Sequence, residues 1–242
     1  MAILAAPNAP LPNLPASPEL ELKFVLPGSL APVLLPWLQA TCLPHPEFPV
    51  ARTSSVYYDT ADWRLLNEKL GSDYFKQKVR LRWYAGTRDD RPAGPAFIEA
   101  KLKEGARRDK VRFRLPEPAG HWAATDLESA AFSEALEALR SEGLTDLGRL
   151  RPAFQIGYRR HRFVHPFSRS TLCLDTDILV ERVHRNRFRH RPCGPLSLAV
   201  LEQKGPLDRL DPAFGDLCRF GARRSAFSKY QHCFAHLMGT FL

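Results

Sequence analysis

Charged and apolar residues alternate with a period of two in many short segments of this chain, and that pattern constrains the fold more than any other feature. Residues 78–84 read KVRLRWY, so an extended strand there would place three cations on one face and apolar side chains on the other. Residues 97–103 read FIEAKLK and residues 110–114 read KVRFR, with the same separation. These segments therefore predict consecutive strands whose charged side chains share one face.

Eight segments fit this description and predict a largely antiparallel sheet. They cover residues 19–24, 54–58, 78–84, 97–103, 110–114, 154–164, 171–180 and 198–204.

Helix signals occur between and after these strands, which makes the predicted fold class α+β. The residues 125–128 read TDLE, a capping box expected to open an amphipathic helix that Gly143 closes. Asp59 or Thr60 would cap a short helix that ends near Gly71. Asp211 precedes a proline that would start another helix, and a terminal helix is expected from about Ser225.

The charged faces admit two interpretations. For a single strand, the simplest is the solvated face of an antiparallel sheet. Repetition over neighbouring strands favours another, because like charges that face each other across strands repel unless an anion neutralises them. We therefore predict an eight-stranded antiparallel β-barrel tunnel with a charged lumen, whose apolar faces pack outward against flanking helices.

Composition limits the domain organisation and the kind of partner. Residues 1–18 are rich in proline and predict a flexible leader, and residues 19–242 predict one domain. The formal charge of +9 favours an anionic partner. Five scattered cysteines with no C-x-x-C spacing suit a reducing compartment, and no segment is long and apolar enough to span a membrane, so we expect a cytoplasmic location.

A face rich in lysine and arginine with a few carboxylates suits a polyphosphate chain and a divalent metal ion. Arginine and lysine bind phosphate oxygens, and carboxylates hold Mg²⁺ or Mn²⁺. Such a site transfers phosphoryl groups largely by positioning and electrostatic stabilisation, without a nucleophilic side chain.

An ordered set of short motifs resembles a known family. Residues 19–23 read ELELK, which resembles the E-x-E-x-K opening of the CYTH, or triphosphate tunnel metalloenzyme, superfamily. The remaining motifs resemble its VTC (vacuolar transporter chaperone) polyphosphate polymerase branch. They are SSVYYDT from residue 54, KVRLRWY from 78, FIEAK from 97, YRR from 158, LDTD from 174, VLEQK from 200 and SKY from 228.

The resemblance implies that ATP donates its γ-phosphate to a growing polyphosphate chain inside the tunnel, with Mn²⁺ or Mg²⁺ as the cofactor. It implies catalytic roles for Arg80, Arg82, Lys229 and Glu202, and metal ligation by Glu202 with Glu21 and Glu99 as helpers. The expected substrate-binding residues are Lys23, Lys78, Arg80, Arg82, Lys101, Lys103, Lys110, Arg112, Arg160, Lys204 and Lys229. The expected partners are ATP, triphosphate and polyphosphate.

Two other functions fit the same residues. The acceptor could be water, which would make the protein a triphosphatase or polyphosphatase, or the face could bind polyphosphate or nucleic acid without catalysis. Asp175 and Asp177 are expected to share a face, as partners of arginines or as a second metal site. The basic stretch at residues 181–191 fits a solvated loop, and also electrostatic attraction of nucleic acid, which we consider the weaker hypothesis; a membrane-protein partner stays open.

Overall fold

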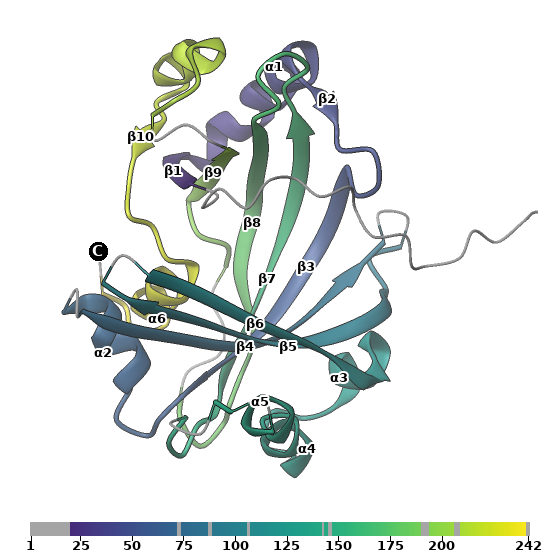
Figure 1. Cartoon of the computed structure of the whole chain (residues 1–242), viewed down its shortest axis with the longest axis vertical. Helices are drawn as coiled ribbons and strands as arrows, with labels where there is room; N and C mark the ends of the chain where they lie inside the picture. The colour runs from purple at the N-terminus through teal and green to yellow at the C-terminus, as the bar shows by residue number, and fades with distance from the viewer. Residues whose placement is uncertain are drawn as a thin grey trace, which may run out of the picture.

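One antiparallel sheet dominates this computed structural model, which describes residues 20–71, 74–86, 89–105, 107–141, 143–144, 147–189, 194–205 and 209–240 (Figure 1). The strands are β1 (Leu20–Pro27), β2 (Leu43–Pro44), β3 (Val50–Asp59), β4 (Phe75–Ala85), β5 (Pro92–Glu104), β6 (Arg107–Pro118), β7 (Arg151–Val164), β8 (Thr171–Val183), β9 (Leu198–Gly205) and β10 (Arg223–Arg224). The helices are η1 (Gly28–Leu30), α1 (Ala31–Thr41), α2 (Arg64–Leu70), α3 (Ala119–Ala124), α4 (Ala130–Glu134), α5 (Glu137–Arg140), η2 (Pro212–Phe220) and α6 (Lys229–Leu237). The predicted leader, residues 1–18, lies outside the described residues.

The eight predicted strands and the α+β class are confirmed. The strand order is β10-β1-β9-β8-β7-β3-β4-β5-β6, and the short β2 pairs with β7. The sequence pattern missed only β2 and β10 among the described strands, because two residues are too few to show a period of two.

The predicted closed barrel is wrong. Within the described residues no ladder joins β6 to β1 or β10, so the sheet is open and β6 and β10 form its edges. Part of the outer edge of β1 is paired with another strand, because Phe24 and Val25 pair with β10. The first half of β6 is an exposed edge that carries several arginines and a lysine, and such charges disfavour pairing with another strand.

The apolar faces of β3 to β6 pack against α3, α4 and α5, as the prediction of outward-facing apolar residues requires. Trp83 of β4 and Ile98 of β5 are buried in the same cluster as Phe132 of α4 and Leu139 of α5. Figure 1 shows these helices on one side of the three crossing strands. This layer leaves the opposite, charged face of β4, β5 and β6 free of the helical core.

A second apolar cluster covers the outer side of β1, β8 and β9. Leu34 and Leu38 of α1 and Phe214 of η2 pack there against Phe24 and Leu201.

No helix of the described part of the chain is long and apolar enough to cross a membrane.

The third cluster lies on the charged side of the sheet and holds α6 and α2 in place. The Tyr230 ring of α6 stacks between Tyr57 of β3 and Phe154 of β7, with ring centroids 5.0 and 5.1 Å apart. The Asp59 carboxylate accepts hydrogen bonds from the backbone N–H groups of Leu65 and Leu66 and from the Tyr230 hydroxyl. One buried side chain therefore fixes the start of α2 and the position of α6.

The helix predictions were correct in part. The helix after Asp59 and Thr60 is α2, which ends at Leu70 with Gly71 as its C-cap, and Asp211 caps the 3₁₀ helix η2. The predicted capping box is wrong, because Thr125 follows the end of α3 and Ser129 caps α4 instead. The terminal helix begins at Lys229, a few residues later than expected.

Substitution of Asp59 by alanine tests this packing. We expect Asp59→Ala to lower the free energy of unfolding by about 3 kcal/mol, because it leaves buried donors on α2 and Tyr230 without an acceptor. Urea unfolding monitored by circular dichroism measures the loss. The exposed Asp216, which forms an ion pair with the exposed Arg219 in η2, provides a control that should change by less than about 0.5 kcal/mol. Equal effects of the two substitutions would contradict the role of Asp59.

Candidate functional site: a cationic face across the sheet

The charged side chains predicted from strand alternation share one face of the sheet, which we call the charged face. Its cations include Lys23, Lys76, Lys78, Arg80, Arg82, Lys101, Lys103, Arg108, Lys110, Arg112, Arg114, Arg160, Lys204 and, from α6, Lys229. Its carboxylates are Glu21, Glu99, Asp175 and Glu202. Among the described residues of this face the cations thus outnumber the carboxylates, and every predicted substrate-binding residue lies on it.

Glu99 lies at the centre of one group of these cations, which we call the Glu99 cluster. Its side chain is 2% exposed and contacts the Arg80 guanidinium at 2.6 Å and the Arg112 Nε at 3.3 Å. Arg82 and Lys110 lie at 4.0 and 3.9 Å from its oxygens. Burial alone would raise the pKa of Glu99, but the arginines outweigh it and hold the pKa at about 2.

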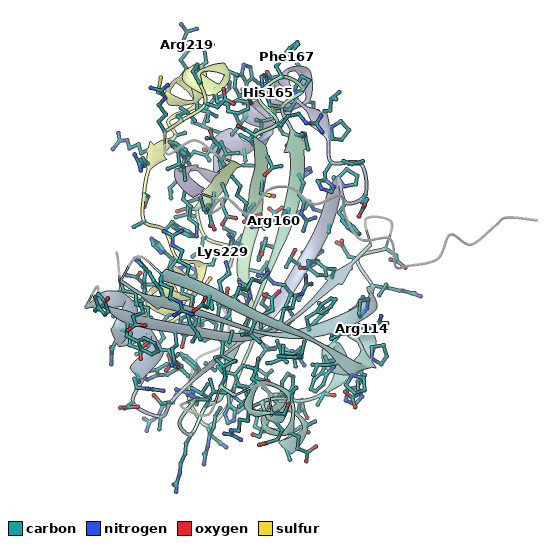
Figure 2. All side chains as sticks on the ribbon, viewed as in Figure 1. Arg114, Arg160, His165, Phe167, Arg219 and Lys229 are labelled. Atoms are coloured by element: carbon teal, nitrogen blue, oxygen red, sulfur yellow. The ribbon has the colours of Figure 1, made fainter. Side chains whose placement is uncertain are left out.

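Lys229 lies in a second group, the Lys229 cluster, on the other side of the face. The Lys229 ammonium is 2.5 Å from Asp175 and 3.3 Å from Glu202. Arg160 makes two hydrogen bonds to Asp175, at 2.5 and 2.6 Å, and another to Glu202 at 2.9 Å. Figure 2 shows Arg160 and Lys229 near each other above the three crossing strands. Burial would lower the pKa of Lys229, but the two carboxylates raise it above its usual value, so the amine is protonated.

Lys23 connects the Lys229 cluster to strand β1. Its ammonium is 3.0 Å from Glu21 and 3.8 Å from Glu202, and it donates a hydrogen bond to the Phe227 carbonyl at 3.5 Å. Burial acts to raise the pKa of Glu202, but Lys229, Arg160 and Lys23 together hold it well below its usual range. The Glu202 carboxylate is therefore ionised, and cations contact both of its oxygens.

Lys78 and Lys101 occupy the part of the face with the least negative charge. The Lys78 ammonium donates to the Ser228 hydroxyl at 2.9 Å, at the start of α6. Burial together with neighbouring cations lowers the pKa of Lys78 to about 7 and that of Lys101 to about 8. These two amines mark a site where the effect of burial and of neighbouring cations exceeds that of the nearby carboxylates.

Sequence reasoning missed the hydroxyl groups that orient the arginines. The Arg82 Nε donates to the Ser55 hydroxyl at 2.9 Å, and another of its nitrogens donates to the Tyr158 hydroxyl at 3.1 Å. Arg80 donates to the Tyr57 hydroxyl at 3.4 Å. Ser55 and Tyr57 alternate on β3, so they share a face, but they carry no charge to show that the face is functional.

The two aspartates of the LDTD motif do not share a face, contrary to prediction. Asp175 is fully buried in the Lys229 cluster, which supports the role of arginine partner. The register of β7 and β8 shifts between Gly157 and Arg159, and Asp177 has a positive φ of 53°. This irregularity interrupts the alternation of β8, so Asp177 lies beside an outer pocket instead.

Arginines in the described part of the basic stretch, residues 181–189, contact the protein itself. Arg182 donates to Gln155 and to the backbone carbonyls of Trp122 and Thr125. The Arg187 guanidinium bonds the Asp59 carbonyl and lies 3.8 Å from the centre of the Trp63 ring. These contacts give the arginines a structural role, which weakens the hypothesis that this stretch attracts nucleic acid.

The predicted metal ligands fall into two separate places. Among the described residues, no three His, Cys, Asp or Glu side chains gather closely enough to hold a metal ion by themselves. Glu21 and Glu202 are both contacted by Lys23, and two such carboxylates suit Mg²⁺ or Mn²⁺ that takes its other ligands from phosphate oxygens and water. Glu99 lies in the other cluster, where four cations surround it. Cations contact Glu202 as well, since Lys23, Arg160 and Lys229 lie within 4.0 Å of its oxygens, so metal ligation by Glu202, Glu21 and Glu99 stays a prediction.

Comparison with known proteins identifies relatives of this arrangement. A family model described as the VTC domain matches residues 21–238, from β1 to the end of α6. A search of curated protein sequences finds no match.

Two solved structures resemble the fold. The PH1819 protein from Pyrococcus horikoshii OT3 is 10% identical with a TM-score of 0.51, and the match covers 90% of this chain and 99% of that chain. A candidate adenylate cyclase from Bacillus halodurans is 16% identical with a TM-score of 0.52, over 87% of this chain and 93% of that chain. At these identities the likeness shows the fold alone.

The Glu99 cluster predicts an acid-sensitive contribution to stability. We expect Glu99→Gln to lower the free energy of unfolding by about 3 kcal/mol at pH 7, because it leaves the buried side of Arg80 and Arg82 without a counter-charge. Since the folded pKa of about 2 lies below the unfolded value of 4.5, this contribution is present above pH 4.5 and is lost as the pH falls toward 2. Urea titrations of both proteins from pH 7 to pH 3 measure it. A constant difference in unfolding free energy across this range would refute the assignment.

Lys78 and Lys101 predict that polyanion binding depends on pH. Long polyphosphate keeps its internal charges in this range, and its binding would raise the pKa of both amines above their free values of about 7 and 8. The affinity should therefore be highest below pH 7 and fall as the pH rises toward 9, with proton uptake on binding. Calorimetric titration in two buffers measures both, and Lys78→Arg should flatten the pH dependence because a guanidinium stays protonated. A pH-independent affinity without proton uptake would contradict this prediction.

Proposed function

This chain belongs to the VTC domain family, and from that premise we propose that it is an ATP-dependent phosphotransferase that extends inorganic polyphosphate. The observation that carries the proposal is the excess of cations over carboxylates among the described residues on one face of the sheet, with two amines whose pKa is lowered by burial and by neighbouring cations. A face of this kind favours a polyanion over a singly charged ligand. Both the donor triphosphate and the growing chain are polyanions.

The proposed reaction needs no nucleophilic side chain. A terminal oxygen of the chain attacks the γ-phosphorus of ATP, the bond from that phosphorus to the β,γ-bridging oxygen breaks, and ADP leaves with the bond electrons. The product chain is longer by one phosphate, and no water is consumed. Protein groups then have two tasks, to align the two phosphates and to stabilise the charge on the transferred group and the leaving oxygen.

Arg80, Arg82 and Lys229 have the geometry for these tasks. Their positions are fixed by Glu99, Ser55 and the two carboxylates of the Lys229 cluster, so little reorganisation is needed when phosphate binds. We propose that Mg²⁺ or Mn²⁺, held by Glu202 and Glu21, offsets charge on the phosphates when it is bound.

Substitution of Glu202 tests the proposal and separates its rivals. With ATP and Mn²⁺, the wild-type protein should yield long polyphosphate on a gel together with stoichiometric ADP. Glu202→Ala should lower turnover by more than about 100-fold while it retains polyphosphate binding through the cations. Glu134→Ala, at an exposed position on α4, should leave turnover within about twofold.

Each alternative gives a different product pattern. Free phosphate without polymer would identify a hydrolase with water as the acceptor. Binding of polyphosphate with no turnover of ATP, triphosphate or polyphosphate would identify a binding module. Either result refutes the polymerase proposal.

A further inference from the structure

The register of β4, β5 and β6 arranges their charged-face side chains in four rungs that cross the three strands. From the α2 end, the rungs are Lys76–Lys103–Arg108, Lys78–Lys101–Lys110, Arg80–Glu99–Arg112 and Arg82–Phe97–Arg114. Successive rungs are about 7 Å apart, since a strand rises about 3.4 Å per residue. The first two rungs contain six cations and no carboxylate, the third contains Glu99, and the fourth contains an aromatic ring.

The α2 end of this ladder carries further lysines. Burial and the nearby Lys76, Lys23 and Lys103 lower the pKa of Lys69, in the last turn of α2. Like charges that face each other across strands destabilise a sheet, so this arrangement favours a bound polyanion. Lysine ammonium groups are flexible point charges that contact phosphate without a fixed bidentate geometry. A phosphate chain can therefore move past them one unit at a time.

The opposite end of the ladder has a different chemistry. The Arg112 guanidinium lies 3.7 Å from the centre of the Phe97 ring, and Tyr84 lies near Arg82 and Arg112. Figure 2 shows Arg114 at the end of β6 that is remote from α2. Aromatic rings and guanidinium planes together provide surfaces on which a nucleobase stacks.

We propose that the charged face is directional. The nucleoside of the donor stacks at Phe97, Arg112 and Tyr84, and the phosphate chain extends over the first rung, past Lys76, Lys103 and Arg108. This inference rests on the proposed function, because a nucleotide donor and a growing chain must occupy the face together. The reacting phosphates then lie between the two ends, beside Arg80, so the base and the chain must point in opposite directions.

Binding measurements on the full chain test the direction without any turnover. Lys103→Gln/Arg108→Gln removes two cations from the first rung. Arg107→Gln/Arg219→Gln is the matched control, because Arg107 lies on the other face of β6 and the exposed Arg219 lies in η2. We expect the rung variant to bind long polyphosphate about tenfold more weakly and triphosphate within about twofold of wild type. The control variant should change both affinities by less than about twofold.

The other end is tested with Phe97→Ala and the pair of ligands ATP and inorganic triphosphate. Since only ATP has a base, we expect the Kd for ATP to rise about tenfold and that for triphosphate to stay within about twofold. Equal effects on ATP and triphosphate, or equal losses in the rung and control variants, would overturn the direction. Length-dependent binding in a protein that makes no polymer would refute the polymerase and leave the direction intact. Polymer synthesis by the wild-type protein, with equal losses of polyphosphate affinity in the rung and control variants, would support the polymerase and refute the direction.

Discussion

Repulsion between like charges on one face of a single sheet is the constraint on which the rest of this structure depends. Neighbouring strands place lysines and arginines directly opposite each other, as in the pairing of Lys78 with Lys101 and of Lys101 with Lys110. Such pairs destabilise a sheet in isolation. The fold tolerates them because the other face is apolar and buries a continuous core against α3, α4 and α5, with Trp83 and Ile98 almost fully buried. Stability is thus supplied by one face, and the charges gather on the other.

The four carboxylates of the charged face are distributed unevenly, and this distribution divides the face by function. Glu99 forms ion pairs with arginines of β4 and β6. Asp175 and Glu202 form ion pairs with Arg160 and Lys229. The paired side chains are thereby fixed in position, as electrostatic catalysis requires. The lysine rungs near α2 contain no carboxylate of their own, and only Lys110 lies within 4.0 Å of Glu99 among their described side chains, so a polyanionic ligand would add balancing charge there. A bound polyanion would therefore stabilise the fold as well as occupy the site.

Alternation predicted most of the sheet and most of the site, because a period of two fixes both the strands and the face on which each side chain lies. It failed where the period is interrupted or too short, as at the β8 irregularity that removes Asp177 from the face, and in the two residues of β10. It also could not show closure, since curvature and the occupation of an edge strand depend on contacts between distant segments. It did not predict the role of neutral partners such as Tyr158, because that role depends on the arginine that the hydroxyl group orients.

The open edge at β6 follows from the same charge distribution that produces the site. To close the barrel, β6 would have to pair along β1, and this would bring the cations at the start of β6 toward Lys23 and Lys204. Part of that edge of β1 is already paired with β10, so closure would break existing hydrogen bonds while it added repulsion. Because the repulsion depends on unneutralised charge, a polyanion bound between β6 and β1 would reduce it.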